Sequence, residues 1–290
     1  MLLLMPTCDT HAAVAEISAA LLERFWPSHP PVHVLHYRVR PRITGAELHD
    51  CGPQDRSPWL ATVAGFLRDR DDELFLLLLE DYAMCAPARV DVIEAGAQLL
   101  RDDPTVGMFA LSWYPARQRT ARASCCSALS THPSALSIVT LSGTPILLQA
   151  AMWRRDWFLE LADRMDPRTS PWGFETAATQ LAKQVPREIC AADIPEPAYI
   201  GGHLVDAFDK SNWPLPYHNL MHRGRPELQH EPFLHREGLG FPSRGLGDTL
   251  ARLARTTGAA RVARALAHAS GRDCGCDRRR QALNKLAPYR

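Results

Sequence analysis

The sequence predicts an α/β fold in which helices flank a sheet, and three observations support this. Residues 2–5 are apolar and strand-like, residues 11–25 have alanine-rich helical spacing, and residues 32–37 alternate like a second strand. A strand, a helix and a strand in this order are typical of a parallel α/β sheet. The continuous apolar run over residues 74–79 has the composition of a central strand that is covered on both faces. A chain of 290 residues with 46% hydrophobic content can bury such a core.

The remaining elements follow from local patterns. Ser57-Pro58-Trp59 begins a helix, since proline is tolerated at an early helical position. Ser142-Gly143-Thr144-Pro145 separates two apolar runs and indicates a hairpin-like pair of strands. We therefore expect, in order, a polar loop after residue 37, a helix over 57–67, the strand over 74–79, a helix over 87–100, a strand over 106–113, a loop over 117–126, two strands over 136–141 and 146–152, and a helix over 154–164.

Charge and composition change near residue 238. Residues 251–290 contain ten Lys/Arg and two Asp, a net charge of +8, whereas the whole chain carries +1, so residues 1–250 carry −7. Gly, Pro and Ser over 238–247 are typical of a linker. We expect a catalytic-type domain over 1–237 and a small basic helical module over 238–290, whose charge favours a polyanionic partner.

Composition also limits where the protein acts. No apolar segment approaches the roughly 20 residues that span a bilayer, and residues 1–5 are too short for a secretory signal. The eight cysteines lack the spacing of a secreted disulfide framework. We expect no membrane span, reduced cysteines and a cytoplasmic location, which is the host cytoplasm if the protein is phage-encoded.

Two adjacent carboxylates, Glu80 and Asp81, directly follow the apolar run. In α/β enzymes, ligands bind beyond the carboxyl ends of the strands. Like charges at close range raise one pKa or recruit a cation, and a divalent metal that bridges two phosphates is one candidate. The alternative is that the pair only ends the strand and pairs with arginines. The residues alone leave both interpretations open.

Other catalytic patterns are missing from the sequence. It contains neither a Gly-x-Ser-x-Gly motif nor a phosphate-binding Gly-x-x-x-x-Gly-Lys-Ser/Thr loop. His29, His33 and His36 gather around the second strand, where alternation sends His33 to the face opposite His36. We expect packing or surface roles for these histidines.

Four separated blocks resemble the GT-A-type glycosyltransferases that are common in phages and in bacterial surface-polysaccharide loci. The resemblance covers roughly residues 1–230. The blocks are Leu-Leu-Leu-Leu-Glu-Asp-Tyr at 76–82, Leu-Gln-Ala-Ala-Met-Trp-Arg-Arg-Asp at 148–156, Ser-Pro-Trp-Gly-Phe-Glu at 170–175, and Pro-Tyr-His-Asn at 216–219 before Arg223-Gly224.

The resemblance implies a GT-A-like (Rossmann-like) mixed sheet and transfer of a sugar from a nucleotide-sugar donor. It also implies that Thr7 and Asp9 line the nucleotide pocket, and that Glu80 and Asp81 meet the diphosphate and a bound Mn²⁺ or Mg²⁺. Glu175 would accept the proton of the acceptor hydroxyl, so Glu175 and Asp81 are the expected catalytic residues.

One departure affects the metal. The family motif separates two aspartates by one residue, whereas Glu80 and Asp81 are adjacent. A single carboxylate could hold the ion, or Arg117, Arg119 or Arg154 could neutralise the phosphates without metal.

Two tryptophans are expected to contact the donor. The apolar face of a sugar ring stacks on indole, and Trp153 and Trp172 lie within the matching blocks. Core packing is the alternative for Trp153, whereas Trp172, between Pro171 and Gly173, is in a position typical of a pocket wall. Further candidates for sugar or phosphate contacts are Asn212, Trp213, Tyr217 and Asn219.

The last 45 residues resemble a short module of phage-type proteins, with a Cys274-Gly275-Cys276 motif. Two thiolates cannot complete a tetrahedral zinc site, so zinc would need His268 or a second chain, and we do not expect it. Nearby cations are candidates for binding a nucleic-acid backbone: Arg278, Arg279, Arg280 and Lys285. The alternative is a solvated basic helix that contacts the acidic domain.

The leading hypothesis is a nucleotide-sugar-dependent glycosyltransferase that acts on a hydroxyl group, for which a hydroxymethylated base in phage DNA is one candidate. A growing surface glycan is the second candidate acceptor. A non-catalytic protein that binds sugar or DNA, and a structural phage component, are the other classes. The residues fix neither the sugar, nor the nucleotide, nor the stereochemical outcome.

Overall fold

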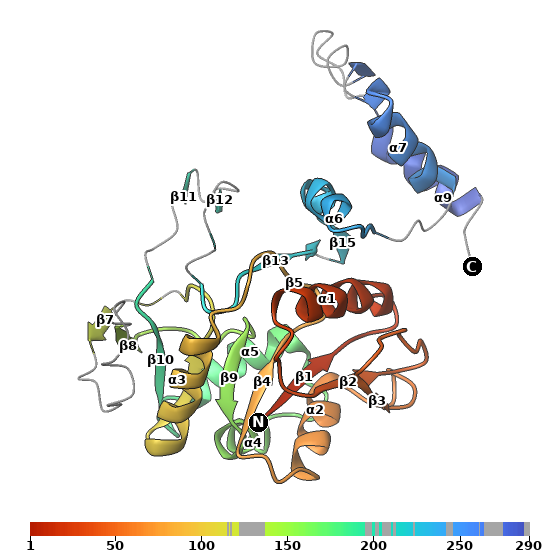
Figure 1. Ribbon diagram of the computed structural model, residues 1–290. Coiled ribbons are helices and arrows are strands. Elements are labelled where there is room, and N and C mark those ends of the chain that lie inside the picture. The colour runs from red at the N-terminus through yellow and green to blue at the C-terminus, as the bar shows by residue number, and fades with distance from the viewer. Residues whose placement is uncertain are drawn as a thin grey trace. The chain divides into compact units, whose positions relative to one another are not determined.

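The computed structural model (Figure 1) describes most of the chain. It divides into two compact units, Met1–Leu239 and Gly240–Arg290, close to the boundary expected at residue 238. The described residues are 1–114, 116, 118–121, 137–194, 199–200, 203–204, 210, 213–222, 224–241, 246–260, 262–263 and 275–286.

The first unit is built on a nine-stranded sheet in the order β3-β2-β1-β4-β9-β6-β10-β8-β7. The pairs β3·β2, β2·β1, β1·β4 and β6·β10 are parallel, whereas β9 runs antiparallel between β4 and β6. Its strands are β1 (Leu2–Pro6), β2 (Val32–His36), β3 (Glu47–Asp50), β4 (Leu74–Leu77), β6 (Val106–Ala110), β7 (Gln118–Ala121), β8 (Ile138–Ser142), β9 (Ala151–Arg154) and β10 (Glu188–Ala192). The fold is α/β, with a large mixed sheet flanked by helices, and this confirms the predicted α/β fold class.

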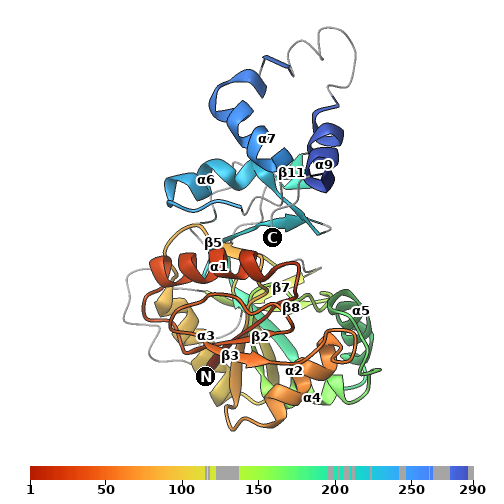
Figure 2. The ribbon, with the colours of Figure 1, turned by 90° about the vertical axis from the view of Figure 1, so that its right-hand side faces the viewer.

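Helices cover both faces of this sheet (Figures 1 and 2). On one face lie α1 (Ala12–Phe25) and α3 (Val90–Asp102), and on the other lie α2 (Trp59–Arg68), α4 (Arg155–Ala162) and α5 (Pro171–Leu181). The second face holds an aromatic cluster in which Trp153 stacks on Trp157 and meets Phe158 edge-on. Because the central strands are covered on both sides, all five residues of β1 are buried.

Short elements extend the first unit beyond the main sheet. The strand β5 (Tyr82–Met84) pairs antiparallel with β13 (Tyr217–Asn219), which brings residues 217–219 next to the segment that follows β4. The other short elements are β11 (Tyr199–Ile200), β12 (His203–Leu204), β14 (Met221–His222), β15 (Arg225–Pro226), the 3₁₀ helix η3 (Leu228–His230) and α6 (Glu231–Arg236).

Four local predictions are wrong. The predicted hairpin does not form, because β8 pairs with β7 and β10 while β9 inserts between β4 and β6. The polar segment after β2 contains β3, and part of the predicted loop over 117–126 is β7. The predicted strand over 74–79 ends at Leu77, so Leu78 and Leu79 lead into a turn.

The second unit contains two described helices, α7 (Leu246–Thr256) and α9 (Cys276–Leu286), which pack against each other. Asp248 accepts a hydrogen bond from the Asn284 side-chain amide at 2.6 Å, and Arg280 lies 3.5 Å from Asp248. This agrees with the expected helical, basic appendage. Across the described residues of both units, no helix has the length and apolar character that crossing a bilayer requires.

We predict that Gly107 is essential for packing β6 against α4. A Cβ atom at this position would lie 2.3 Å from the buried Trp157 ring, which has no room to move. Gly107→Ala should lower the free energy of unfolding by about 1–3 kcal/mol in urea denaturation. The control Gly65→Ala meets nothing within 4 Å on α2 and should be neutral or stabilising by up to about 1 kcal/mol. Equal stability of both variants would contradict this packing.

Candidate functional site

A pocket of about 570 Å³, which we call the main pocket, opens at the carboxyl ends of β1 and β4. Its wall contains the residues that follow β1, the turn after β4, the first turn of α5 and the segment after β13. The acidic turn, Glu80-Asp81, therefore shares one pocket with Trp172 and Glu175. Segments that are about 90 residues apart in the sequence meet here, at the edge where α/β enzymes bind ligands.

Backbone contacts hold the acidic turn in place. The buried Ser18 hydroxyl on α1 donates to the Glu80 carbonyl at 2.7 Å, and the Leu220 N–H donates to the Asp81 carbonyl at 2.8 Å. The turn is thus tied both to α1 and to the segment after β13. These contacts fix the backbone of both residues of the turn.

His11 gives the acidic turn a positive partner. It lies directly before α1, and its Nδ1 is 2.5 Å from a carboxylate oxygen of Glu80. Hydrogen bonds to Cys8 and Glu80 raise the pKa of His11 to about 10. The imidazole is therefore protonated at neutral pH, and it brings a fixed positive charge to the main pocket.

Among the carboxyl groups of the described residues, Asp81 has the largest change in pKa. Burial, and to a smaller extent the charge of Glu80, raises the pKa of Asp81 to about 7. Near neutral pH this side chain is divided between its acid and its carboxylate. It can hence give or take a proton, or accept a nearby anion without full repulsion.

Glu175 lies on the opposite wall, on α5. Ser170 caps this helix by accepting a hydrogen bond from the Gly173 N–H at 3.2 Å, and Pro171 follows at a position where no N–H is needed. One carboxylate oxygen of Glu175 accepts the Leu148 N–H at 2.7 Å. Burial raises the pKa of Glu175, and the Leu148 hydrogen bond opposes this. Its other oxygen has no hydrogen-bond partner among the described residues.

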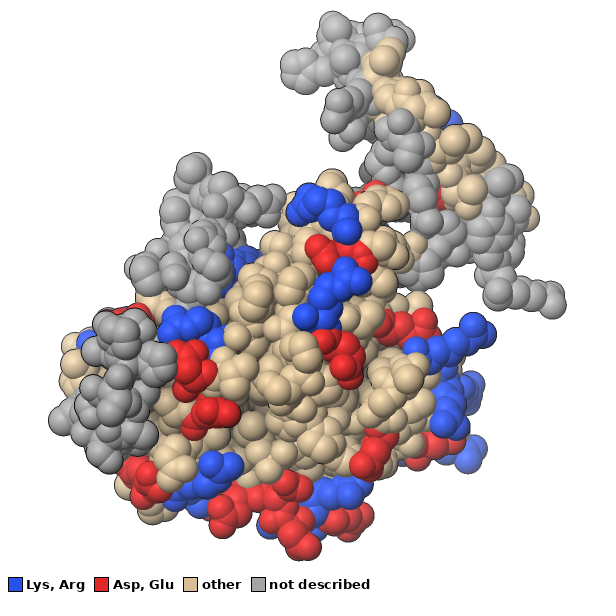
Figure 3. Space-filling view, in the orientation of Figure 1, with Lys and Arg blue, Asp and Glu red and all other residues tan. Residues whose placement is uncertain are grey.

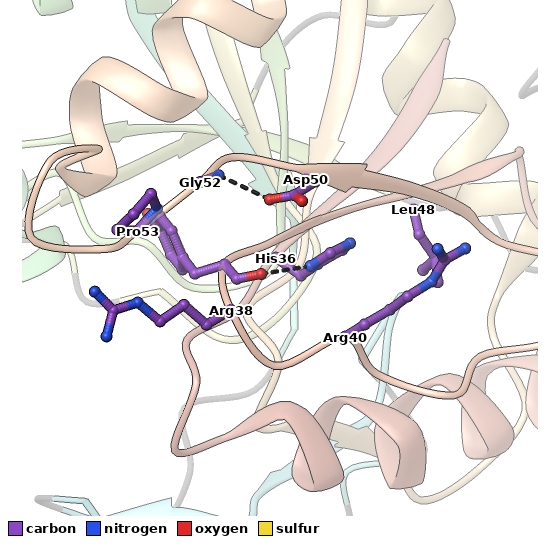
Figure 4. A pocket seen from close by; sticks show the side chains of 8 residues that line it. His36, Arg38, Arg40, Leu48, Asp50, Gly52 and Pro53 are labelled. Atoms are coloured by element: carbon purple, nitrogen blue, oxygen red, sulfur yellow. Dashed lines mark hydrogen bonds between the residues drawn. The ribbon is translucent and has the colours of Figure 1, made fainter.

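A second, smaller pocket of about 380 Å³, the side pocket, lies at the carboxyl ends of β2 and β3 (Figure 4). Arg38 and Arg40 line it, and their guanidinium groups point in different directions (Figure 4). Tyr37 lines both the side pocket and the main pocket, so the two are neighbours. The side pocket adds positive charge beside the acidic main pocket.

The predicted donor contacts divide into two groups. Thr7 and Trp172 line the main pocket, and Trp172 is 75% exposed on its rim. Trp153 is 0% exposed within the aromatic cluster, so its predicted donor contact is wrong, and core packing is its role. Asp9 is not part of either pocket wall; it accepts the Val39 N–H at 2.8 Å and so holds the loop between Arg38 and Arg40.

The other predicted cations lie elsewhere. Arg119 donates to the Tyr114 carbonyl at 3.0 Å and Arg154 to the Leu100 carbonyl at 2.6 Å, so neither serves the main pocket. Arg117, Asn212 and Cys274 are outside the described residues.

In the second unit Arg278 and Arg279 are exposed on α9, whereas nothing is described for the side chain of Lys285. The surface of the first unit in Figure 3 has basic and acidic side chains interspersed.

The predicted Mn²⁺ or Mg²⁺ does not fit the side chains present. Both ions prefer oxygen ligands, but Glu80 is engaged by His11, and the described ligand cluster that contains Glu80 is completed by Cys8 and His11. The ligand atoms of Cys8, His11 and Glu80 lie within 4.8 Å of one another. A sulfur, nitrogen and oxygen set suits zinc better than magnesium, and the protonated His11 offers no lone pair at neutral pH.

Several pocket residues escaped the sequence analysis. Cys8 and His11 follow β1, Tyr37 and Arg38 follow β2, and all four lie at carboxyl ends of parallel strands. The rule that ligands bind beyond such ends was applied to β4 and would have found them. Asn219, named as a further candidate, does line the main pocket, whereas Tyr217 lies buried against Tyr82.

Comparisons with known proteins add little. No protein-family model matches the chain, and no curated protein matches its sequence. Among solved structures, the chain is similar to a CMP:2-keto-3-deoxy-manno-octonic acid synthetase complexed with CTP, at 13% identity and a TM-score of 0.39. The match covers 66% of this chain and 88% of that chain. A likeness of this size leaves the activity of the chain open.

We predict a pH window for the stability that Asp81 controls. The pKa of Asp81 is about 7 in the folded chain and 3.8 for the free side chain, so between about pH 4 and 7 the folded state holds a proton that the unfolded state has released. The Asp81 contribution to the free energy of unfolding is therefore lost as pH rises through this window. Asp81→Asn cannot ionise and should gain about 2–4 kcal/mol over the native chain between pH 4 and 8 in urea titrations. Parallel pH profiles would contradict the raised pKa.

Proposed function

We propose that the protein is a glycosyltransferase that moves a sugar from a nucleotide-sugar donor to an acceptor hydroxyl group. The observation that carries this proposal is that Glu80, Asp81, Trp172 and Glu175 line one pocket at the carboxyl ends of β1 and β4. A volume of about 570 Å³ is within the range of small-molecule sites. An exposed indole at its rim offers a stacking face for a sugar ring.

In this proposal the donor lies across the two neighbouring pockets. The nucleotide occupies the side pocket, where Arg38 and Arg40 supply positive charge, and the sugar occupies the main pocket against Trp172. The diphosphate lies between them, beside Tyr37, which lines both pockets. There it meets the protonated His11 of the main pocket. Charge-assisted hydrogen bonds to cations are among the strongest contacts that a phosphate makes.

The chemical step is a single displacement. The acceptor oxygen bonds to the anomeric carbon, and its proton passes to Glu175, whose raised pKa makes it a better base than an exposed glutamate. The bond from the anomeric carbon to the phosphate oxygen breaks, and its electron pair leaves with the diphosphate. His11 stabilises the charge that develops there.

A donor panel and the Glu175→Gln variant test this function together. The native chain should be protected against thermal unfolding by one class of nucleotide-sugar and should transfer or hydrolyse its sugar. Glu175→Gln should keep the donor affinity and lose at least about 100-fold in kcat, because the amide cannot take the proton. The control Glu160→Gln changes an exposed α4 pair with Arg164 and should leave kcat intact. Protection without turnover in the native chain would instead identify a binding protein.

A second test concerns the leaving diphosphate. His11→Gln should weaken binding of the nucleoside diphosphate about tenfold in calorimetric titrations, since it removes a charged partner. The exposed His235→Gln on α6 is the matched control and should bind normally. With His11 in this role, turnover should persist in EDTA. Turnover that EDTA abolishes and Mn²⁺ restores would contradict the metal-free mechanism and support the metal expected from the sequence.

The acceptor is the part that the pocket constrains least. Exposed Arg278 and Arg279 on α9 remain the candidates for contact with DNA, in which a hydroxymethylated base would be the acceptor. Transfer to modified duplex DNA that falls steeply with salt would favour this acceptor. Transfer to an oligosaccharide regardless of salt would favour a surface glycan.

A further inference from the structure

We propose that His33, Glu47 and His49 form a binding site for a divalent cation of borderline softness, with zinc as the best fit. The site is separate from both pockets and independent of the proposed function. His33 pairs with Glu47 in the parallel register of β2 and β3, and His49 follows two residues later. Strand alternation puts these three side chains on one face of the sheet and the side-pocket residues His36, Leu48 and Asp50 on the other.

The distances between the ligand atoms match a metal site. Nδ1 of His33 lies 3.1 Å from Nε2 of His49 and 3.3 Å from Oε2 of Glu47, and the third separation, from His49 to Glu47, is 4.0 Å. Tetrahedral zinc with bonds of 2.0–2.1 Å holds its ligand atoms about 3.3 Å apart. The longest separation involves Glu47, whose side chain is 61% exposed and free to adjust.

The surroundings fix the two imidazoles and leave access for an ion. The rings stack on each other with centroids 5.3 Å apart, and both pack on Phe66 of α2 at 5.5 and 4.9 Å. The edge strand β3 leaves Glu47 in solvent, so a water molecule can complete the fourth position. Two nitrogens and one carboxylate oxygen are a ligand set typical of zinc with one open position.

A hydrogen bond between two neutral imidazoles is the competing explanation for the 3.1 Å distance. This explanation accounts for His33 and His49 but gives no role to Glu47, whose carboxylate lies near Nδ1 of His33 and Nε2 of His49. The Arg70 guanidinium packs over the same Phe66 ring, 4.6 Å from its centroid, and its charge works against a cation. The Glu47 carboxylate is therefore the group on which a metal site depends most.

The test uses the full chain without a histidine tag. Cys8, Cys274 and Cys276 are first changed to serine, which removes the thiol of the other candidate metal cluster and the two thiols of the Cys-Gly-Cys motif. Zn²⁺ is titrated against a chromophoric chelator, and Co²⁺ is added separately to record its absorption spectrum. One Zn²⁺ per chain, with tetrahedral Co²⁺ bands, is expected. Glu47→Gln and His49→Gln should each weaken Zn²⁺ binding by more than about tenfold.

Two controls keep the test decisive. His29→Gln removes a histidine that pairs with Glu23 at 2.9 Å outside the cluster, and it should bind Zn²⁺ normally. Glu47 is exposed, so its amide variant should keep the fold, which far-UV circular dichroism verifies. The proposal is overturned if the chain binds no Zn²⁺, if Glu47→Gln and His49→Gln bind it as tightly as the parent, or if His29→Gln loses binding equally.

Discussion

The burial of two adjacent carboxylates at the end of β4 is the constraint on which the site depends. Like charges this close resist burial together, and the chain meets the cost in two ways. Glu80 is paired with a protonated His11 at 2.5 Å, while Asp81 holds its proton to about pH 7. Ser18 and Leu220 fix the backbone between them. Removing His11 would leave the Glu80 carboxylate without its charged partner in the main pocket.

The sequence predicted the central strands and their helices because local patterns determine them. Residues 74–77 are apolar without interruption, and only a strand covered on both faces needs that. The position of β9 has no such local signal, since Ala151–Arg154 could pair with β8 as easily as with β4. Insertion between β4 and β6 is settled by packing of Trp153 against α4, a contact between distant segments. The polar strand β3 was missed because an edge strand needs little apolar character.

The sequence also predicted part of the candidate site and missed the rest. Position after a strand identified Glu80 and Asp81, and the position of Trp172 between Pro171 and Gly173 identified the pocket rim, although this segment is the first turn of α5. Trp153 carried the same chemical signal as Trp172 but points into the core, and residue type alone does not decide between the two faces of a strand. The proposed metal site at His33 could not be predicted, because its partners Glu47 and His49 belong to the strand that was not expected.

Among the described residues, two side-chain clusters could hold a metal, and the one beside the acidic turn contains a protonated histidine. His11 is held protonated by Glu80 and Cys8, so it acts as a cation and competes with a metal for the same carboxylate. A diphosphate that binds beside the acidic turn would contact the positive charge of His11. The negative charge of the diphosphate would raise the pKa of Asp81 further. Donor binding and proton uptake by Asp81 are then linked at neutral pH. The acidic turn therefore loses part of its negative charge as the anion binds, which reduces the repulsion between them.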